Sequence, residues 1–169
     1  MKSHLSLVTL FCLTVAVTSC GPATEQPAPE PEATTAADVA AINRVHDEYT
    51  AALNAGDAAA YVALLTEDVF VMPPNQPAAI GQEASRARIQ RLFDQNTLEI
   101  ARSVKEVVVV GDWAFSRHTG TGTLTPKAGG EPTEFRNKGM AIFQRQPDGS
   151  WKIARYIFNS NTPPSGTGQ

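Results

Sequence analysis

Apolar residues at helical spacing mark the first two helices of the folded part of the chain. The residues that recur three or four positions apart, with polar residues between them, are Val39, Ile42, Val45, Tyr49 and Leu53. Thr35 and Asp38 have the spacing of a capping box, and Gly56 supplies a stop signal. Asp57 is placed to cap a second, short helix that runs through Leu65.

The later part of the chain changes to alternation with a period of two, which predicts strands. A short strand at 69–72 and a third helix at 82–95 come before this change. The long strands are expected at 100–110, 113–126, 135–146 and 151–159. Turn signals separate them at 111–112, 129–130 and 147–149. Helices followed by an antiparallel meander predict an α+β domain in which one curled sheet wraps around the helices.

The start of the chain predicts export. A basic start followed by an apolar run at 5–17 is the layout of a secretory signal peptide. The residues at 17–20 resemble the lipobox of bacterial lipoproteins, which implies removal of 1–19 and lipidation of Cys20. Cys12 is the other cysteine, so the mature chain has no internal disulfide. An ordinary cleaved signal peptide is the alternative, and a transmembrane anchor is disfavoured because the run falls short of about 20 residues.

Composition predicts a spacer, one domain and a short tail behind this leader. Residues 20–37 are rich in proline and glutamate and lack aromatic side chains, as in a disordered linker. Residues 38–160 suffice for one domain with its own core, and 161–169 are expected to be a flexible tail. The net charge of -3 without a basic patch argues against nucleic acid as a partner. The expected location is the cell envelope, on the periplasmic face of the outer membrane or the outer face of the cytoplasmic membrane.

Several motifs resemble the nuclear transport factor 2-like superfamily, which includes ketosteroid isomerase and the SnoaL-like polyketide cyclases. They are YTAALNAGD at 49–57, ALL at 63–65, ED at 67–68, MPPN at 72–75, GQEA at 81–84, LTPK at 124–127 and PDGSWKI at 147–153. The last four resemble a narrower, bacterial SnoaL-like group defined as a domain of unknown function. The resemblance implies a cone-shaped domain with a curved antiparallel sheet around three N-terminal helices, often dimeric through the sheet. It also implies an apolar pocket between the sheet and the first helix.

Ketosteroid isomerase depends on an aspartate base, a tyrosine and a protonated aspartic acid. Laid over this chain, the tyrosine falls on Tyr49, the base at or beside Pro73 and the second acid near Met140. Neither proline nor methionine can give or take a proton, so isomerase chemistry by that route is not expected.

The candidate pocket residues are Tyr49, Met72, Trp113, Phe115, Arg117, Met140 and Asn159. Tyr49 would donate its hydroxyl to a ligand, or else would bond to a strand. The three candidates in the strand at 113–126 share one face. If that face is concave, Arg117 would bind a carboxylate or an enolate, and if it is convex, Arg117 is a surface charge. Arg136 and Lys138 raise the same question on the next strand.

The candidates for catalysis are Tyr49, Asp68 and His118. Tyr49 would polarise a carbonyl oxygen, and a water molecule, Asp68 or His118 would move the proton. His46 and His118 lack metal-ligand spacing, and no glycine-rich phosphate loop follows a strand. Neither a metal nor a cofactor is therefore expected.

Three functions are compatible with these patterns. The first is a membrane-anchored binding module that encloses a small, mostly apolar ligand and forms a homodimer. The second is an isomerase, cyclase or dehydratase that acts on a carbonyl-bearing small molecule. The third is an interaction module that docks a partner or a second copy through its outer sheet face.

Overall fold

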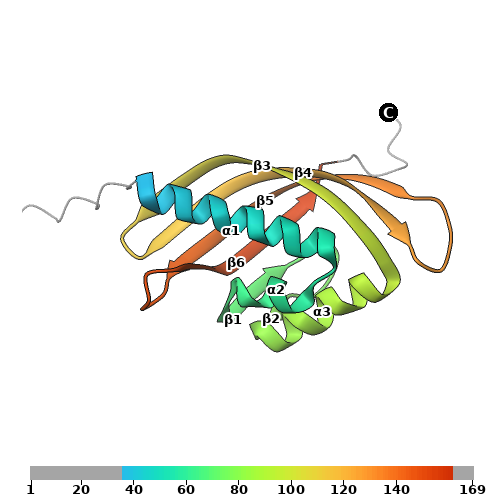
Figure 1. Ribbon diagram of the computed structural model, residues 1–169, viewed down its shortest axis with the longest axis horizontal. Helices are drawn as coiled ribbons and strands as arrows, with labels where there is room; N and C mark the ends of the chain where they lie inside the picture. The colour runs from blue at the N-terminus through green and yellow to red at the C-terminus, as the bar shows by residue number, and fades with distance from the viewer. Residues whose placement is uncertain (1–35, 162–169) are drawn as a thin grey trace, which may run out of the picture.

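A curved six-stranded sheet folds around helix α1 in the computed structural model, which describes residues 36–161 (Figure 1). The elements are α1 (Ala36–Ala55), α2 (Ala58–Ala63), β1 (Leu65–Met72), β2 (Ala79–Ile80), α3 (Gly81–Gln95), β3 (Asn96–Val110), β4 (Trp113–Pro126), β5 (Thr133–Arg145) and β6 (Trp151–Ser160). The expected leader, the lipidated Cys20, the linker up to residue 35 and the tail beyond residue 161 lie outside the described residues. No described helix combines the length and the hydropathy that crossing a bilayer requires.

The sheet has the strand order β2-β1-β6-β5-β4-β3. Strands β3 to β6 form the expected antiparallel meander. The prediction of a wholly antiparallel sheet is wrong at one place, because β1 pairs with β6 in parallel. This pairing joins the start of the domain to its end, and no local pattern announces such a contact. The α+β architecture with a curved sheet and helices that precede the meander is confirmed.

Helix α1 lies along the concave side of the sheet, as Figure 1 shows. Its buried residues follow the helical period and are Ile42, Val45, His46, Tyr49, Ala52 and Leu53. Gly56 ends the helix with a φ of 65°, a left-handed conformation that glycine adopts without strain. The Asp57 carboxylate then accepts hydrogen bonds from two backbone N–H groups of α2, each 2.9 Å long, as its position predicts.

The start of α1 is tied to the turn between β5 and β6. Asp38 Oδ1 accepts hydrogen bonds from Arg145 Nη1 at 2.8 Å and from Trp151 Nε1 at 3.3 Å. The Arg145 guanidinium also lies 4.4 Å from the centre of the Trp151 ring. These contacts hold the first turn of α1 against the turn between β5 and β6.

The two faces of β4 differ in the size of their side chains. Its inner face carries Ala114, Ser116 and His118, which are buried beneath α1. Its outer face carries Trp113, Phe115 and Arg117, and the indole of Trp113 is 45% exposed. Small side chains face inward because α1 must approach the strand closely, while the larger ones point away from the helix.

Candidate ligand-binding cavity

A cavity of about 290 Å³ opens between α1, α3 and the inner face of the sheet. Helix α1 supplies residues from its C-terminal half, α3 supplies one face, and strands β3 to β6 supply the remaining wall. The lining residues are Tyr49, Leu53, Pro74, Arg88, Ile89, Leu92, Leu98, Ile100, Arg102, Leu124, Phe135, Arg136, Asn137, Tyr156, Phe158, Asn159 and Ser160. Most of this wall is aliphatic or aromatic, which is typical of sites for small organic ligands.

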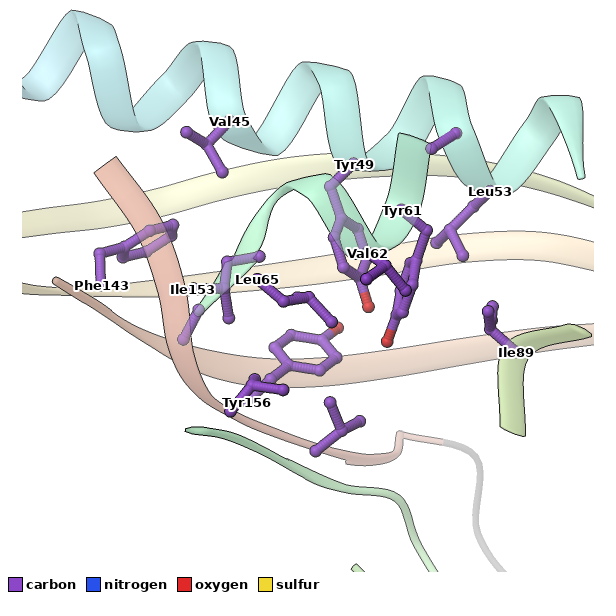
Figure 2. Packing of buried hydrophobic residues seen from close by; sticks show 14 of the residues in the cluster. Val45, Tyr49, Leu53, Tyr61, Val62, Leu65, Ile89, Phe143, Ile153 and Tyr156 are labelled. Atoms are coloured by element: carbon purple, nitrogen blue, oxygen red, sulfur yellow. The ribbon is translucent and has the colours of Figure 1, made fainter. Parts of the chain in front are cut away.

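Three tyrosines gather beside the cavity. The rings of Tyr49 and Tyr61 lie 5.0 Å apart and those of Tyr49 and Tyr156 lie 5.6 Å apart. Figure 2 shows their hydroxyls pointing toward a common region between α1, α2 and β6. Burial raises the pKa of each of the three phenols. The hydroxyls therefore stay neutral at physiological pH and act as hydrogen-bonding groups rather than as phenolate bases.

Two histidines lie behind Tyr156, deeper in the core. His118 Nε2 is 3.1 Å from the Tyr156 hydroxyl, and the two rings are stacked 5.5 Å apart. His46 Nε2 is 2.8 Å from Ser116 Oγ. Burial, with a further contribution from the charge of Arg102, lowers the pKa of His46 to about 4 and that of His118 to about 3. Both imidazoles are neutral at pH 7.

Three arginines bring positive charge to the cavity, the exposed Arg136 and the half-buried Arg88 and Arg102. The Arg102 guanidinium lies 4.5 Å from the ring centre of Tyr49 and 5.6 Å from that of Tyr156. The Arg88 guanidinium lies 5.8 Å from the ring centre of Phe158, which stacks on Tyr156. Among the described residues, no aspartate or glutamate lines this cavity. The site thus combines an apolar wall with cations and neutral hydroxyls, and it lacks a carboxylate that could act as a base.

The structure brings two of the seven candidate pocket residues, Tyr49 and Asn159, to the cavity. The other five do not line it. They are Met72, Trp113, Phe115, Arg117 and Met140. Arg117, Met140 and Met72 stand in one row across the outer face of the sheet, where Ile157 joins them. Arg117 is therefore a surface charge, and its Nε forms a 2.6 Å ion pair with Glu106.

The catalytic candidates are also separated. Tyr49 lines the cavity, and His118 reaches it only through Tyr156. Asp68 does not line the cavity, and it accepts hydrogen bonds from Thr66 at 2.9 Å and from Arg155 at 3.2 Å. These bonds, that from Thr66 first, lower the pKa of the Asp68 carboxyl. Asp68 thus lies within β1, where its carboxylate is bonded to Thr66 and Arg155 away from the cavity.

Sequence reasoning missed Arg88, Arg102, Asn137 and Tyr156. A signal for Arg102 is present in the alternation of β3, where Leu98 and Ile100 precede it in the same inward phase. A charged residue in the buried phase of an amphipathic strand is costly and thus points to a site. Tyr156 had no comparable signal, because a β-bulge between β5 and β6 shifts the phase of its strand.

Within residues 36–161, no group of three or more histidine, cysteine, aspartate or glutamate side chains is gathered as a metal ion would require. Asn137 Oδ1 is buried at the cavity without a hydrogen-bond partner from the described residues. It therefore provides a polar acceptor that a ligand can use.

Comparison with known proteins places this geometry in a family. The chain is similar to a ketosteroid isomerase-like protein from Erwinia carotovora atroseptica, with 32% identity over 76% of this chain and 100% of that one, at a TM-score of 0.72. It is 28% identical to a protein from Planctomyces limnophilus over 71% and 93% of the two chains, at a TM-score of 0.67. A type 2 hexachlorocyclohexane dehydrochlorinase, only 12% identical over 75% and 86%, shares the fold at a TM-score of 0.68.

No curated protein matches the sequence. The SnoaL-like domain family, by contrast, matches residues 29–156, which include α1, α3, strands β1 to β5 and the first part of β6. Its match covers most of the chain, and a protein with 32% identity covers 76% of the chain. The chain therefore belongs to the SnoaL-like domain family of the nuclear transport factor 2-like fold.

Proposed function

We propose that this protein is a binding module that holds a small, mostly apolar molecule in the cavity between α1, α3 and the sheet. The observation that carries the proposal is the wall itself, which is apolar over most of its extent and has no aspartate or glutamate from residues 36–161. A wall of this kind favours an apolar body by the hydrophobic effect. Tyr49, Tyr156 and Asn137 then supply a few polar contacts that orient the ligand.

An enzyme acting on a carbonyl-bearing small molecule is the second candidate, and the contact between Tyr156 and His118 favours it. Tyr156 would bond to the carbonyl oxygen, and His118 would supply or accept the proton behind it. A general base works best when its pKa lies near the working pH. The pKa of His118 is lowered to about 3 by burial and by Arg102, so it is a weak base. Binding without turnover is therefore the better reading of the site.

A thermal-shift screen with small apolar carbonyl, phenol and carboxylate compounds tests the proposal. A ligand at a hundred times its Kd should stabilise the fold by about 2.7 kcal/mol, which is a shift of several degrees in Tm. Leu124→Trp, which fills the cavity, should abolish the shift, whereas Ala87→Trp on the exposed side of α3 should leave it intact. A blank screen on well-folded protein would refute the binding function. If the parent protein converts a compound found in the screen and His118→Gln does not, the enzymatic function is favoured instead.

We also propose a homodimer formed through the outer face of the sheet. Exposed apolar side chains gather there, with Trp113 45% exposed, Met140 39% exposed and Ile157 49% exposed. Exposed apolar side chains gathered on one face mark an interaction surface, and a second copy would cover them with the same residues. Native mass spectrometry at micromolar concentration should show a dimer. A double substitution of Met140 and Ile157 by lysine should yield monomers, and Ala87→Lys should not; a monomeric parent protein contradicts the proposal.

The proposed location is the bacterial cell envelope, where a lipid on Cys20 would hold the domain at a membrane. The apolar run at 5–17 and the lipobox-like residues at 17–20 support this proposal. Acyl chains add about 0.8 kcal/mol of membrane affinity for each buried methylene, so two or three of them form a stable anchor. Mass spectrometry should find acylated Cys20 at the mature N-terminus, and Cys20→Ser should release the protein from the membrane fraction. Unmodified Cys20 in the mature protein would rule out the anchor.

A further inference from the structure

Ion pairing distinguishes the half-buried arginines of the cavity from the other half-buried arginines. All nine arginines of the chain lie among the described residues, and four of them are half-buried. Two of these four form ion pairs, Arg145 with Asp38 and Arg155 with Asp68. The other two are Arg88 and Arg102, and both line the cavity. No ion pair is formed by either of them within 36–161.

Three of the nitrogens of these two guanidiniums are also without a hydrogen-bond partner among the described residues. Nε and Nη1 of Arg102 and Nε of Arg88 are buried and lack a hydrogen-bond partner among residues 36–161. Both guanidiniums also contact rings, Arg102 those of Tyr49 and Tyr156, and Arg88 that of Phe158. Contacts with aromatic rings stabilise a guanidinium, but they do not replace the hydrogen bonds that its N–H groups lose on burial.

The two charges share one environment. Arg102 contacts Tyr156 and Arg88 contacts Phe158, and these two rings are stacked with their centres 5.4 Å apart. Arg136 lines the same cavity, so the part of the chain that the structure describes places three cations and no carboxylate around it. Like charges in a partly dry site repel one another and lose hydration. An anion that entered the cavity would relieve both costs.

We propose that the ligand of this cavity is an organic acid, with an apolar body in the aliphatic wall and a carboxylate on Arg102 and Arg88. This inference rests on the binding function proposed above and names its ligand class. A carboxylate matches the planar fork of a guanidinium and accepts two parallel hydrogen bonds from it. The neutral Tyr156 hydroxyl donates a further bond to the acid when His118 Nε2 carries the hydrogen that bonds to the tyrosine oxygen.

Matched pairs of an acid and its amide provide the test, because the apolar body is the same in both. Phenylpropanoate with phenylpropanamide and octanoate with octanamide are titrated into the protein at neutral pH by calorimetry. The acid of at least one pair should bind at least about tenfold more tightly than its amide, as expected for charge-assisted hydrogen bonds. Arg102→Met should remove this preference and Arg88→Met should weaken it. Arg117→Met, on the outer face, should leave it unchanged.

Stability gives a second readout that does not depend on the ligand. Arg102→Met removes a half-buried cation without an ionic partner, so the unliganded variant should have an equal or higher Tm than the parent protein. Arg145→Met, which breaks an ion pair, should lower the Tm. If Arg102→Met does not fold, Arg102→Lys keeps the charge but loses the fork, and it should still reduce the preference for the acid.

The outcomes separate this inference from the binding function. Equal binding of acid and amide overturns the organic-acid assignment while the binding function stands. A preference for the acid that survives in Arg102→Met and Arg102→Lys also overturns it. Absence of binding for both members of both pairs overturns the assignment, and a blank result with every other apolar compound overturns the binding function as well.

Discussion

His46 and His118 lie in the core with their ring centres 5.4 Å apart, and each is only 2% exposed. The groups that surround them are Ser116 and Phe143 beside His46, Tyr156 beside His118, and Arg102, whose charge reaches both. None of these groups is a carboxylate that could stabilise an imidazolium. Mild acid should therefore destabilise the fold, because the two histidines bind protons more readily in the unfolded chain than in the folded chain.

The sign and the size follow from the pKa values. In the unfolded chain a histidine titrates near 6.5, whereas in the fold the pKa of His46 is about 4 and that of His118 is about 3. Between these limits the unfolded state binds more protons, so the free energy of unfolding falls as the pH falls. At about pH 5 each histidine costs about 2 kcal/mol relative to about pH 7.5, and the pair costs about 4 kcal/mol. This is a large part of the 5–15 kcal/mol typical of a domain, taken as an order of magnitude.

Urea unfolding between about pH 7.5 and about pH 5 measures this loss. Hydrogen-bonded carboxylates contribute little in this window, because the pKa values of Asp68 and Asp148 are lowered from 3.8 by bonds from Thr66 and Ser150. Their stabilisation is lost only at lower pH. His46→Gln and His118→Gln should each remove about half of the pH dependence. The reasoning would be refuted by a free energy of unfolding that does not change between these two pH values. It would also be refuted if the variant with both histidines replaced lost as much stability over this range as the parent protein.

Two further predictions concern the backbone. Gly122→Ala should cost at least about 2 kcal/mol of stability in urea unfolding, because its Cβ would lie 2.1 Å from the carbonyl oxygen of Glu99. Gly111→Ala meets no atom within 4 Å and should cost only about 1 kcal/mol, the strain of its positive φ. Asp57→Ala should cost about 1 kcal/mol through loss of the α2 cap, measured in the same way, and Asp57→Asn should restore most of it.

Local patterns predict the elements of this fold well where one face of the helix or strand is buried and the other is exposed to solvent. Helix α1 follows its apolar stripe, and the turn at Gly111 joins the expected pair of long strands. The expected start of β1 at residue 69 is too late. Residues Leu65 to Asp68 pair with no strand that is adjacent to β1 in the sequence, so no local pattern marks them. The partner is β6, and a parallel pairing over that separation depends on the whole fold.

The face of β4 could not be assigned because both of its faces carry apolar residues. The usual expectation that large aromatic side chains turn inward favours Trp113 and Phe115. The helix that covers the sheet requires the opposite, since Ala114 and Ser116 leave room for α1. The outer face remains apolar, which the proposed dimer explains. A strand with apolar residues on both faces shows no clear alternation of polar and apolar positions. A one-residue error in assigning its inward positions then places every candidate residue on the wrong face of the sheet.

Met140 is the position near which the resemblance to ketosteroid isomerase places its second acid. Met140 faces outward and is 39% exposed, whereas its neighbour Gly139 faces His118. The conclusion survives the correction because the inward positions beside it, Asn137 and Ala141, carry no proton-accepting group either. A site that needs a base must hold a carboxylate or a titrating imidazole inside, and this cavity holds neutral tyrosines and arginines. The cations of this cavity favour the arrival of a ligand that already carries the negative charge.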